Sequence, residues 1–473
     1  MKRIVSDSPD SIRCSRRRFL KTTAAAASAV VAAPYLVPSS VLGVHSPSNR
    51  VNVGIIGMGN QSTLDVPAFL ENDDAQVVAV CDVNTASYGY RDPQQYLGRK
   101  PGQEKVNAYY ASKRPSGQYK GCDAYNDFRK IIDRKDIDAV AIIVPDHWHA
   151  IITVMAAKAG KDVYCEKPLS LTVGQGQAMV KAVRHYQRIL QMGSHWRSSP
   201  SCRRAAELVR NGRLGQVKRV LAFLPPNNAK DPGPGWKPMP VPDGFDYERW
   251  LGPAPAAPYH IDRCLYRFRF ILDYSGGQVT NFGTHAFNMI QWGLGTDDTT
   301  PVEFEGLGAE FPPKGSLFST ATKVNFHARY ANGVELRCDT RDPKLFGVRF
   351  EGTEGALNYG YRGITTEPAS IKDSPLAAHE IHLPVSNPRR KEDKSKFYIP
   401  DHVRDFLLSV KSRKDPIEPV EIAHRMTSIC HLGNIAMLLN RKLQWDPVKE
   451  HFLGDEQANA MLSRPIRGSW QLD

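Results

Sequence analysis

The sequence of 473 residues predicts an α/β fold built in two parts. Residues 51–165 alternate short β-branched apolar runs with periodic segments of helical length, which is typical of a doubly wound parallel sheet. After residue 171, strand-like runs separated by turns replace that alternation, and they indicate a C-terminal α+β domain with a large, open mixed or antiparallel sheet. We expect the first part over 44–170, the second over 171–443 and a tail over 444–473.

The first elements carry the clearest pattern. Val51–Ile56 is a short, mostly β-branched apolar run that stops at Gly57-Met58-Gly59, so it predicts a buried strand followed by a tight turn. A periodic segment of about ten residues comes next, and a second apolar run, Val77–Val80, leads to Asp82. Strand, glycine turn, helix, strand and acid in this order indicate a Rossmann dinucleotide-binding unit.

Each residue of that pattern has a chemical task. Gly57 permits a turn that a side chain would block, and Gly59 lets the backbone approach a pyrophosphate, whose charge the helix N-terminus stabilises. Asp82 stands where a carboxylate accepts hydrogen bonds from a ribose and repels a 2′-phosphate, which favours NAD over NADP. Ser62 replaces the third glycine of the usual pattern, and its side chain is small enough for the helix to pack on the strand.

The remaining elements follow in chain order. In the first part we expect a long polar insertion over 88–120, a helix over 125–134, a strand over 139–144, a helix over 151–159 and a strand over 162–165. In the second part we expect a helix over 173–186, strands over 189–192, 216–224, 322–330, 333–338 and 347–352, a proline-rich loop over 225–258, and helices over 401–411 and 420–439. The carboxyl ends of the first-part strands are the expected catalytic edge.

Residues 1–43 resemble a twin-arginine export signal. Ser15–Lys21 holds paired arginines followed by Phe-Leu-Lys, and Thr22–Val37 is an alanine-rich, weakly hydrophobic run, too short for a stable transmembrane helix. We therefore expect passage through the twin-arginine translocation machinery, a periplasmic or otherwise exported location, and no stable membrane insertion after cleavage. A basic amphipathic tail is the alternative.

Composition excludes several other classes. The chain has 41% hydrophobic and 23% charged residues, as an ordinary soluble globular protein does. Of its formal net charge of +13, +5 lies in residues 1–43 and the rest is spread along the chain, so we expect no nucleic-acid partner. The eight cysteines show no C-x-x-C spacing. They predict scattered core residues, neither a disulfide framework nor a metal site.

Several motifs together resemble the Gfo/Idh/MocA family, which includes glucose–fructose oxidoreductase and inositol dehydrogenase, and within it an exported bacterial branch. The motifs are Pro145-Asp146-His147-Trp148-His149, Glu166-Lys167-Pro168, Tyr247–Pro253, Gly276-Gly277 with Asn281–His285, and Trp445-Asp446-Pro447 through Asn459. They cover the whole chain after the leader, and they are specific for fold and cofactor but not for substrate.

The resemblance implies roles for individual residues. Lys167 would contact the nicotinamide ribose and the reacting hydroxyl, and His285 would take the proton from a sugar hydroxyl while hydride leaves the same carbon. The expected cofactor contacts are Gly57, Gly59, Asn60, Gln61, Asp82, Pro145, His149, Glu166 and Lys167. The expected substrate contacts are His195, Arg197, Asn281 and His285.

One position departs from the family pattern. Many members have aspartate four residues before the histidine, where this chain has Asn281. On a helix this spacing places Asn281 beside His285, so the amide would orient the ring or bind substrate. It cannot ionise, and an Asp–His proton pair is therefore in doubt.

Three functions remain open at this point. The first is an exported NAD-dependent oxidoreductase that acts on a sugar, cyclitol or glycoside with a tightly bound, recycled cofactor. The second is a glycosidase or lyase that oxidises its sugar transiently and returns the hydride. The third is a carbohydrate- or nucleotide-binding protein without catalysis. The resemblance also implies a homo-oligomer, a dimer or tetramer, formed through the open face of the second sheet.

Overall fold

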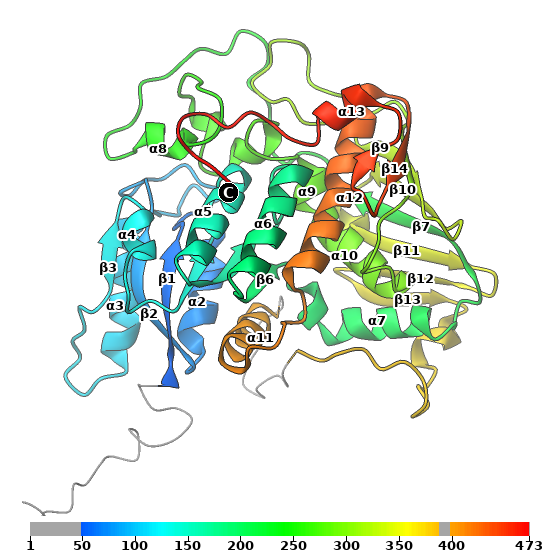
Figure 1. The fold of residues 1–473 in the computed structure, drawn as a ribbon, viewed down its shortest axis with the longest axis horizontal. Helices are drawn as coiled ribbons and strands as arrows, with labels where there is room; N and C mark the ends of the chain where they lie inside the picture. The colour runs from blue at the N-terminus through cyan, green and yellow to red at the C-terminus, as the bar shows by residue number, and fades with distance from the viewer. Residues whose placement is uncertain (1–48, 387–397, 473) are drawn as a thin grey trace, which may run out of the picture. The chain divides into compact units, whose positions relative to one another are not determined.

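Two β-sheets organise the described part of the chain, which comprises residues 49–386 and 398–472 of a computed structural model. A six-stranded parallel sheet is followed by a nine-stranded mixed sheet, and helices pack between and around them (Figure 1). This arrangement confirms the predicted fold class. The predicted export signal and its cleavage site lie outside the described residues.

The first sheet has the strand order β3-β2-β1-β4-β5-β6, and every neighbouring pair is parallel. The strands are β1 (Val51–Ile56), β2 (Ala75–Cys81), β3 (Asp123–Tyr125), β4 (Ala139–Ile142), β5 (Asp162–Glu166) and β6 (Leu190–Gly193). The order reverses between β1 and β4, and a crevice at such a reversal is where open α/β sheets bind ligands.

Helices cover both faces of this sheet, because its strands are apolar on both sides. One face carries α2 (Ser62–Glu71), α3 (Arg99–Ser112) and the distant α11 (Ile399–Ser412), whose buried side chains share one hydrophobic cluster with β1. The other face carries α4 (Arg129–Ile132), α5 (Asp146–Lys158) and α6 (Val173–His185). Helix α6 lies between α5 and α12 (Val420–Leu439) of the second part (Figure 1), and it packs against both of them.

The second sheet has the order β13-β12-β11-β7-β10-β9-β8-β14-β15, antiparallel except between β7 and β10. Its strands are β7 (Val217–Leu224), β8 (Glu303–Gly306), β9 (Asn325–Arg329), β10 (Glu335–Thr340), β11 (Gly347–Gly352), β12 (Ala356–Gly360), β13 (Gly363–Glu367), β14 (Lys442–Asp446) and β15 (His451–Phe452). The other helices are α7 (Pro200–Arg210), α8 (Tyr247–Leu251), α9 (Gln278–Asn281), α10 (Gly283–Leu294), α12 (Val420–Leu439) and α13 (Glu456–Ala460). Helices α7, α10 and α12 pack on one face of this sheet.

Three local predictions were wrong. The expected insertion over 88–120 contains α3, whose buried side chains Val106 and Tyr110 pack against β2. The expected helix over 125–134 is reduced to α4, because Tyr125 ends β3. The expected tail after 444 contains β14 and β15, which extend the second sheet.

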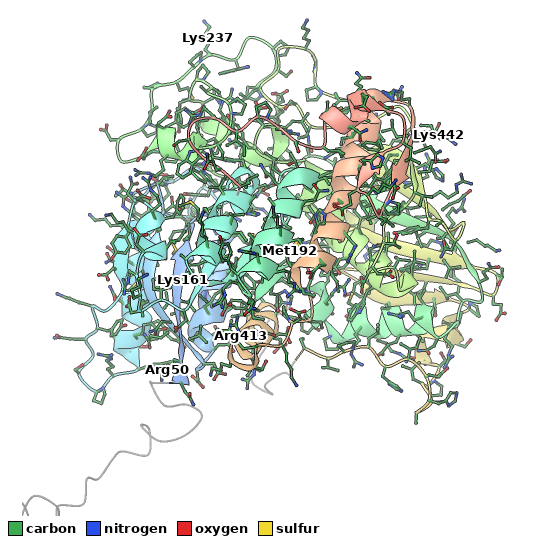
Figure 2. All side chains as sticks on the ribbon, viewed as in Figure 1. Arg50, Lys161, Met192, Lys237, Arg413 and Lys442 are labelled. Carbon is green, nitrogen blue, oxygen red and sulfur yellow. The ribbon has the colours of Figure 1, made fainter. Side chains whose placement is uncertain are left out.

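The first sheet also continues past the boundary that we expected at residue 170. Helix α6 and strand β6 complete it, and β6 pairs with β5 from Val163 to Glu166. Met192 on β6 is fully buried and lies near the centre of the molecule (Figure 2), where its carbonyl oxygen is 2.8 Å from His402 Nε2 on α11. Strand β6 therefore joins the first sheet to elements that come late in the sequence.

The cysteines and the long helices of the described residues bear on two of the sequence predictions. Seven cysteines there are all buried and free, as scattered core residues would be. Among these residues no helix combines the length and the apolar character needed to cross a membrane.

Trp445 gives a test of the closing strand β14. Its side chain is 2% exposed, its indole N–H donates to Thr300 Oγ1 at 3.1 Å, and its ring meets Phe452 edge to face. We expect Trp445→Ala to lower the free energy of unfolding by about 3–5 kcal/mol, since it removes a large buried side chain. Val448→Ala in the same connection, where the side chain is 90% exposed, should change it by less than about 0.5 kcal/mol. Urea denaturation of both variants measures the change in the free energy of unfolding. Equal changes in the two variants would show that the packing of Trp445 on β14 does not stabilise the second sheet.

Candidate active site

A pocket opens at the carboxyl end of the first sheet, at the reversal between β1 and β4. It brings together residues from five separate segments of the first part and a roof from the second part. Nine residues with predicted site roles line it: Gly57, Gly59, Asn60, Gln61, Asp82, Pro145, Glu166, Lys167 and Asn281. Residues that were singled out from the glycine pattern and from the family resemblance therefore meet at one edge of the first sheet.

The turn after β1 is held by Asp82. One carboxylate oxygen accepts the Met58 N–H at 2.7 Å, and the other accepts the Asn84 N–H at 2.7 Å. Gly57 has φ +102° and an added Cβ would come within 2.1 Å of the Ile143 carbonyl oxygen, so no side chain fits there. Ser62 donates to the Gly59 carbonyl at 2.7 Å, and the start of α2 is therefore fixed without a third glycine.

These residues fit a dinucleotide. The peptide groups of 57–61 and the start of α2 form the type of turn that receives a pyrophosphate. Burial raises the pKa of Asp82, and the hydrogen bonds from Asn84 and Met58 oppose that change. The carboxylate keeps lone pairs beyond those two bonds, and a ribose hydroxyl can donate to them.

The roof of the pocket comes from the segment between β7 and α9, which was predicted as a proline-rich loop and a tryptophan element. The roof residues that line the pocket are Phe245, Arg249, Trp250, Leu265, Phe268, Arg269 and Ser275. Ser275 donates to the buried Asp146 at 2.6 Å, and the Trp250 carbonyl accepts from the Trp148 indole at 3.0 Å. Both bonds fasten the roof to the first turn of α5.

Lys167 lies between the two parts. Its Nζ donates to Asn281 Oδ1 at 3.0 Å, and its backbone N–H donates to Glu166 at 3.1 Å. Burial lowers the pKa of the Lys167 ammonium, the negative charge of Glu166 opposes this, and the charge of Arg269 adds to it. Lys167 is thus a half-buried side chain whose ammonium donates to a neutral amide.

His285 lies on the first turn of α10 and stacks on Trp196, with ring centroids 5.4 Å apart. Its Nδ1 is 2.9 Å from the Ser194 carbonyl oxygen, which accepts only, so Nδ1 carries the proton and Nε2 is left as the basic nitrogen. Burial, then the charges of Lys167 and His195, lower the pKa of His285 well below its usual value. The imidazole is therefore neutral at pH 7.

Asn281 does not orient His285, contrary to one of the two roles that we expected. Asn281 ends α9 and His285 belongs to α10, with Phe282 between the two helices. The Asn281 amide spans Lys167 Nζ and Gln278 Oε1. Asn281 therefore positions the Lys167 ammonium and not the His285 ring.

His149 has a positioning role in the structure and does not line the pocket. Its side chain is 1% exposed. Its ring nitrogens lie 2.7 Å from the Pro168 carbonyl oxygen and 2.9 Å from that of Val144. Burial would lower its pKa, but Cys165, Asp146 and the Pro168 carbonyl raise it to about 10. As a cation with two N–H donors, His149 ties together two loops that line the pocket.

His195 and Arg197, predicted as substrate contacts, point elsewhere. Arg197 is 3% exposed and its guanidinium donates to both oxygens of Asp297, at 2.9 and 2.5 Å, and to Asn288. His195 is 7% exposed and its Nε2 lies 3.0 Å from the Tyr164 hydroxyl. Neither lines the pocket, because the loop after β6 turns both side chains into the protein.

The sequence analysis assigned no role to two acidic residues near the site, Asp146 and Glu418. Asp146 lies inside a motif that we quoted, and its place at a strand end was the available signal. Glu418 carried no such signal, since it is far along the chain from Ser194, whose hydroxyl it binds, and from Asn288, which donates to its other oxygen. Burial raises the pKa of Glu418 to about 7, and this carboxyl holds the residue whose carbonyl orients His285.

Two models of one protein family match most of the chain. Residues 51–194 match the oxidoreductase family's NAD-binding Rossmann fold. Residues 234–472 match the same family's C-terminal alpha/beta domain. Together they cover the first sheet, the strands of the second sheet apart from β7, and the residues that line the pocket.

The curated relatives match over part of their length. They include a levoglucosan dehydrogenase of Pseudarthrobacter phenanthrenivorans (38% identical over 21% of this chain and 24% of that protein) and a myo-inositol 2-dehydrogenase of Thermotoga maritima (28%, over 39% and 46%). A glycosyl hydrolase family 109 protein of Shewanella pealeana is 27% identical over 44% of this chain and 45% of its own. The chain thus spans less than half the length of each of these three relatives.

Solved structures share the fold at lower identity. A levoglucosan dehydrogenase in complex with NADH and levoglucosan has a TM-score of 0.57 at 17% identity, covering 84% of this chain and 99% of its own. An aldose–aldose oxidoreductase from Caulobacter crescentus, complexed with glycerol, has a TM-score of 0.54 at 20% identity, with the same coverage.

Asp82 should control the choice of nucleotide. We expect Asp82→Ala to weaken NAD binding by about tenfold or more, or ~1.4 kcal/mol, because the ribose loses an acceptor and the Met58 N–H loses its partner. NADP should gain relative to NAD, because the repulsion of a 2′-phosphate is removed. Titration of tryptophan fluorescence with each nucleotide measures both effects. The matched control is Asp133→Ala at an exposed position, and an unchanged NAD affinity in Asp82→Ala would contradict the assignment.

Proposed function

Because this chain belongs to the Gfo/Idh/MocA oxidoreductase family, we propose that it transfers hydride between a nicotinamide and a hydroxyl-bearing carbon of a sugar, cyclitol or glycoside. The observation that carries the proposal is that Lys167 and Asn281 line the dinucleotide pocket, while His285 lies on the helix that follows Asn281 and is near enough to Lys167 for the lysine charge to lower the His285 pKa. Lys167 comes from the end of β5, and the other two come from the α9–α10 junction. NAD held in this pocket supplies the hydride acceptor or donor.

The three side chains divide the work on the substrate. His285 Nε2 accepts the proton from the reacting hydroxyl, since Nδ1–H is engaged by the Ser194 carbonyl. The Lys167 ammonium donates a hydrogen bond to the same oxygen and stabilises negative charge that develops there. Asn281 positions the ammonium through the 3.0 Å bond to Nζ. In the reverse direction His285 returns the proton as the carbonyl is reduced.

The roof supports a cofactor that stays bound between turnovers. Aromatic side chains of the roof, among them Phe245 and Trp250, belong to one buried cluster, so opening the pocket would expose apolar surface. A retained cofactor has to be regenerated in place. We therefore propose that one sugar is oxidised and a second is reduced on the same nicotinamide.

Export and assembly complete the proposal. The paired arginines of the leader support twin-arginine translocation, which carries folded proteins, and a periplasmic or otherwise exported location.

For a homo-oligomer we propose the uncovered face of the second sheet as the interface. Cross-strand ion pairs there, Arg219–Glu351 and Arg349–Glu367, would make that interface polar. Cell fractionation tests the location, and light scattering of the purified protein tests the assembly.

A second candidate is net hydrolysis or elimination of a glycoside through transient oxidation. The similarity to a glycosyl hydrolase family 109 protein favours it, as does a retained cofactor that ends each cycle in its starting state. Oxidation of a hydroxyl to a ketone acidifies the neighbouring C–H, and the hydride returns after the glycosidic substituent has left. Turnover without added NAD, with solvent deuterium entering the sugar, would distinguish this candidate from simple oxidoreduction.

Lys167 and His285 provide the direct test of hydride transfer. The purified protein is denatured to identify bound nucleotide, and the intact protein is mixed with a sugar panel while reduced-nicotinamide absorbance is followed. We expect a sugar-dependent signal that falls by about 10²–10⁴ in Lys167→Met and in His285→Gln, with NAD affinity changed little in His285→Gln. Lys158→Met on the exposed end of α5 is the control. Bound NAD with no signal for any sugar would favour a binding protein instead.

Asn281 offers a test through pH. A carboxylate beside Nζ would favour the charged form, so Asn281→Asp should raise the apparent pKa of Lys167 by about 1–3 pH units. The limb of the pH–rate profile that reports loss of the Lys167 proton should move to higher pH by the same amount. Asn332→Asp, at an exposed position, should leave the profile unchanged. If Asn281→Asp also leaves it unchanged, Lys167 does not titrate in the rate-limiting step.

A further inference from the structure

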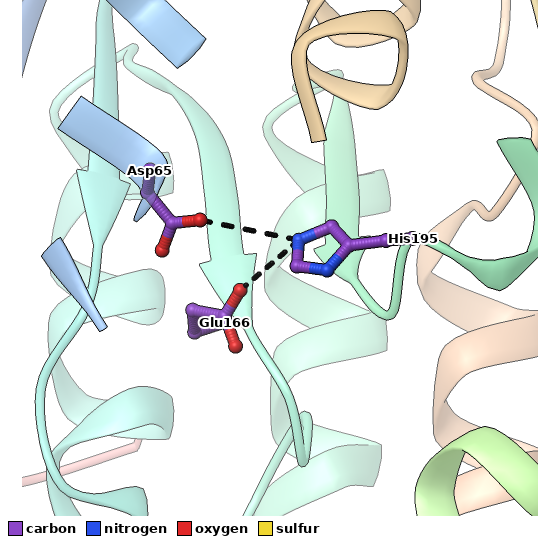
Figure 3. Close-up of side chains that lie close together, drawn as sticks. All are labelled: Asp65, Glu166 and His195. Carbon is purple, nitrogen blue, oxygen red and sulfur yellow. Dashed lines mark ion pairs between the residues drawn. The ribbon is translucent and has the colours of Figure 1, made fainter. Parts of the chain in front are cut away.

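A buried cluster of Asp65, Glu166 and His195 adjoins the pocket, which Glu166 itself lines. The three come from α2, the end of β5 and the loop after β6, and their side chains point toward one another (Figure 3). His195 Nε2 is 3.3 Å from Glu166 Oε1 and 4.0 Å from Asp65 Oδ1. One ligand atom from each side chain lies within 4.8 Å of the other two.

Two carboxylate oxygens in the cluster lack hydrogen-bond partners. Asp65 is 0% exposed and Glu166 4% exposed, yet Asp65 Oδ2 and Glu166 Oε1 accept no hydrogen bond. Glu166 Oε1 is the oxygen that faces His195. Leaving a buried carboxylate oxygen unsatisfied is costly, so this geometry calls for a ligand that carries positive charge.

We propose that Asp65, Glu166 and His195 bind a divalent transition-metal cation such as Zn²⁺. Imidazole nitrogen together with carboxylate oxygen is a donor set that suits such ions. Zn²⁺ binds these atoms at about 2.0–2.2 Å, so its ligands lie roughly 3–4 Å apart. The His195–Glu166 pair already meets that spacing, and a small rotation of the Asp65 side chain brings in the third ligand.

The charges and hydrogen bonds of the neighbouring groups are compatible with a cation at this position. The two carboxylates supply a negative charge that balances the +2 of such an ion. Lys167 does not satisfy the cluster, because its Nζ donates to Asn281. The Tyr164 hydroxyl, 3.0 Å from His195 Nε2, is placed to serve as a further oxygen ligand or to bond a coordinated water.

The cation would act on the active site through Glu166. One oxygen of Glu166 faces His195, and the other accepts the Lys167 backbone N–H at 3.1 Å. Fixing the Glu166 carboxylate therefore fixes the start of the Lys167 loop. Since Glu166 also lines the pocket, the pocket gives an ion access to the cluster before a nucleotide covers it. The role of the cation is positional, and the reacting atoms lie on the other side of Glu166.

The test uses the whole purified protein, stripped of metal with a chelator and titrated calorimetrically with ZnSO₄ or CoCl₂. We expect one ion per chain, with affinity reduced by about 100-fold or more in Asp65→Asn and in His195→Gln. His185→Gln, which removes an exposed histidine on α6, is the matched control and should bind as the parent does. Circular dichroism and NAD titration establish that each variant is folded, independently of hydride transfer.

The unmodified protein supplies a second measurement that needs no variant. X-ray absorption of the cobalt- or zinc-loaded chain should show nitrogen and oxygen ligands with a single imidazole and no sulfur. An absence of stoichiometric binding overturns the proposal, as does a spectrum with sulfur or several imidazoles, or full binding in both ligand variants. The cluster would then hold a shared proton in place of a metal.

Discussion

The site depends on the hydrogen bond between Lys167 and Asn281, because it joins the two halves of the chain at the reacting position. The lysine follows the fifth strand of the parallel sheet, and the asparagine precedes the helix that carries His285. A neutral partner holds the ammonium in place without neutralising it. Burial then keeps the Lys167 pKa below its usual value, which suits a group that must exchange hydrogen bonds with a reacting oxygen.

The carboxylates of the site act one contact away from the reacting groups. Asp82 holds the glycine turn through the Met58 N–H, Asp146 holds the roof through Ser275, and Glu418 holds Ser194, which orients His285. No carboxylate among the described residues hydrogen-bonds to Lys167 Nζ. Buried acids therefore position the residues of this site. The two residues proposed to act on the substrate are the Lys167 ammonium, which donates a hydrogen bond, and the neutral His285, which accepts a proton.

The short-range sequence pattern predicted those parts of the fold that depend on residues close together in the chain. The glycine turn, Asp82, Pro145 and the Glu166-Lys167 pair follow strands directly, and parallel strands bring their carboxyl ends to one edge whatever lies between them. Helix α3 was missed because its buried side is narrow, with Val106 and Tyr110 as its main apolar contacts. Strand β14 was missed because its pairing partner, β8, lies more than a hundred residues earlier, and only tertiary contact makes it a strand.

Side-chain direction was the property that sequence could not supply. His149, His195 and Arg197 all follow sheet strands, as the pocket residues do, and the family resemblance predicted them as ligand contacts. In the structure the His195 backbone adopts φ 63°, so the loop after β6 carries its side chain toward Asp65 and Glu166 and carries Arg197 toward Asp297. The same turn that removes His195 from the sugar site thus completes a compact donor set behind it. The resemblance indicated which residues belong to this region of the fold, and the backbone conformation of the loop decides which groups their side chains meet.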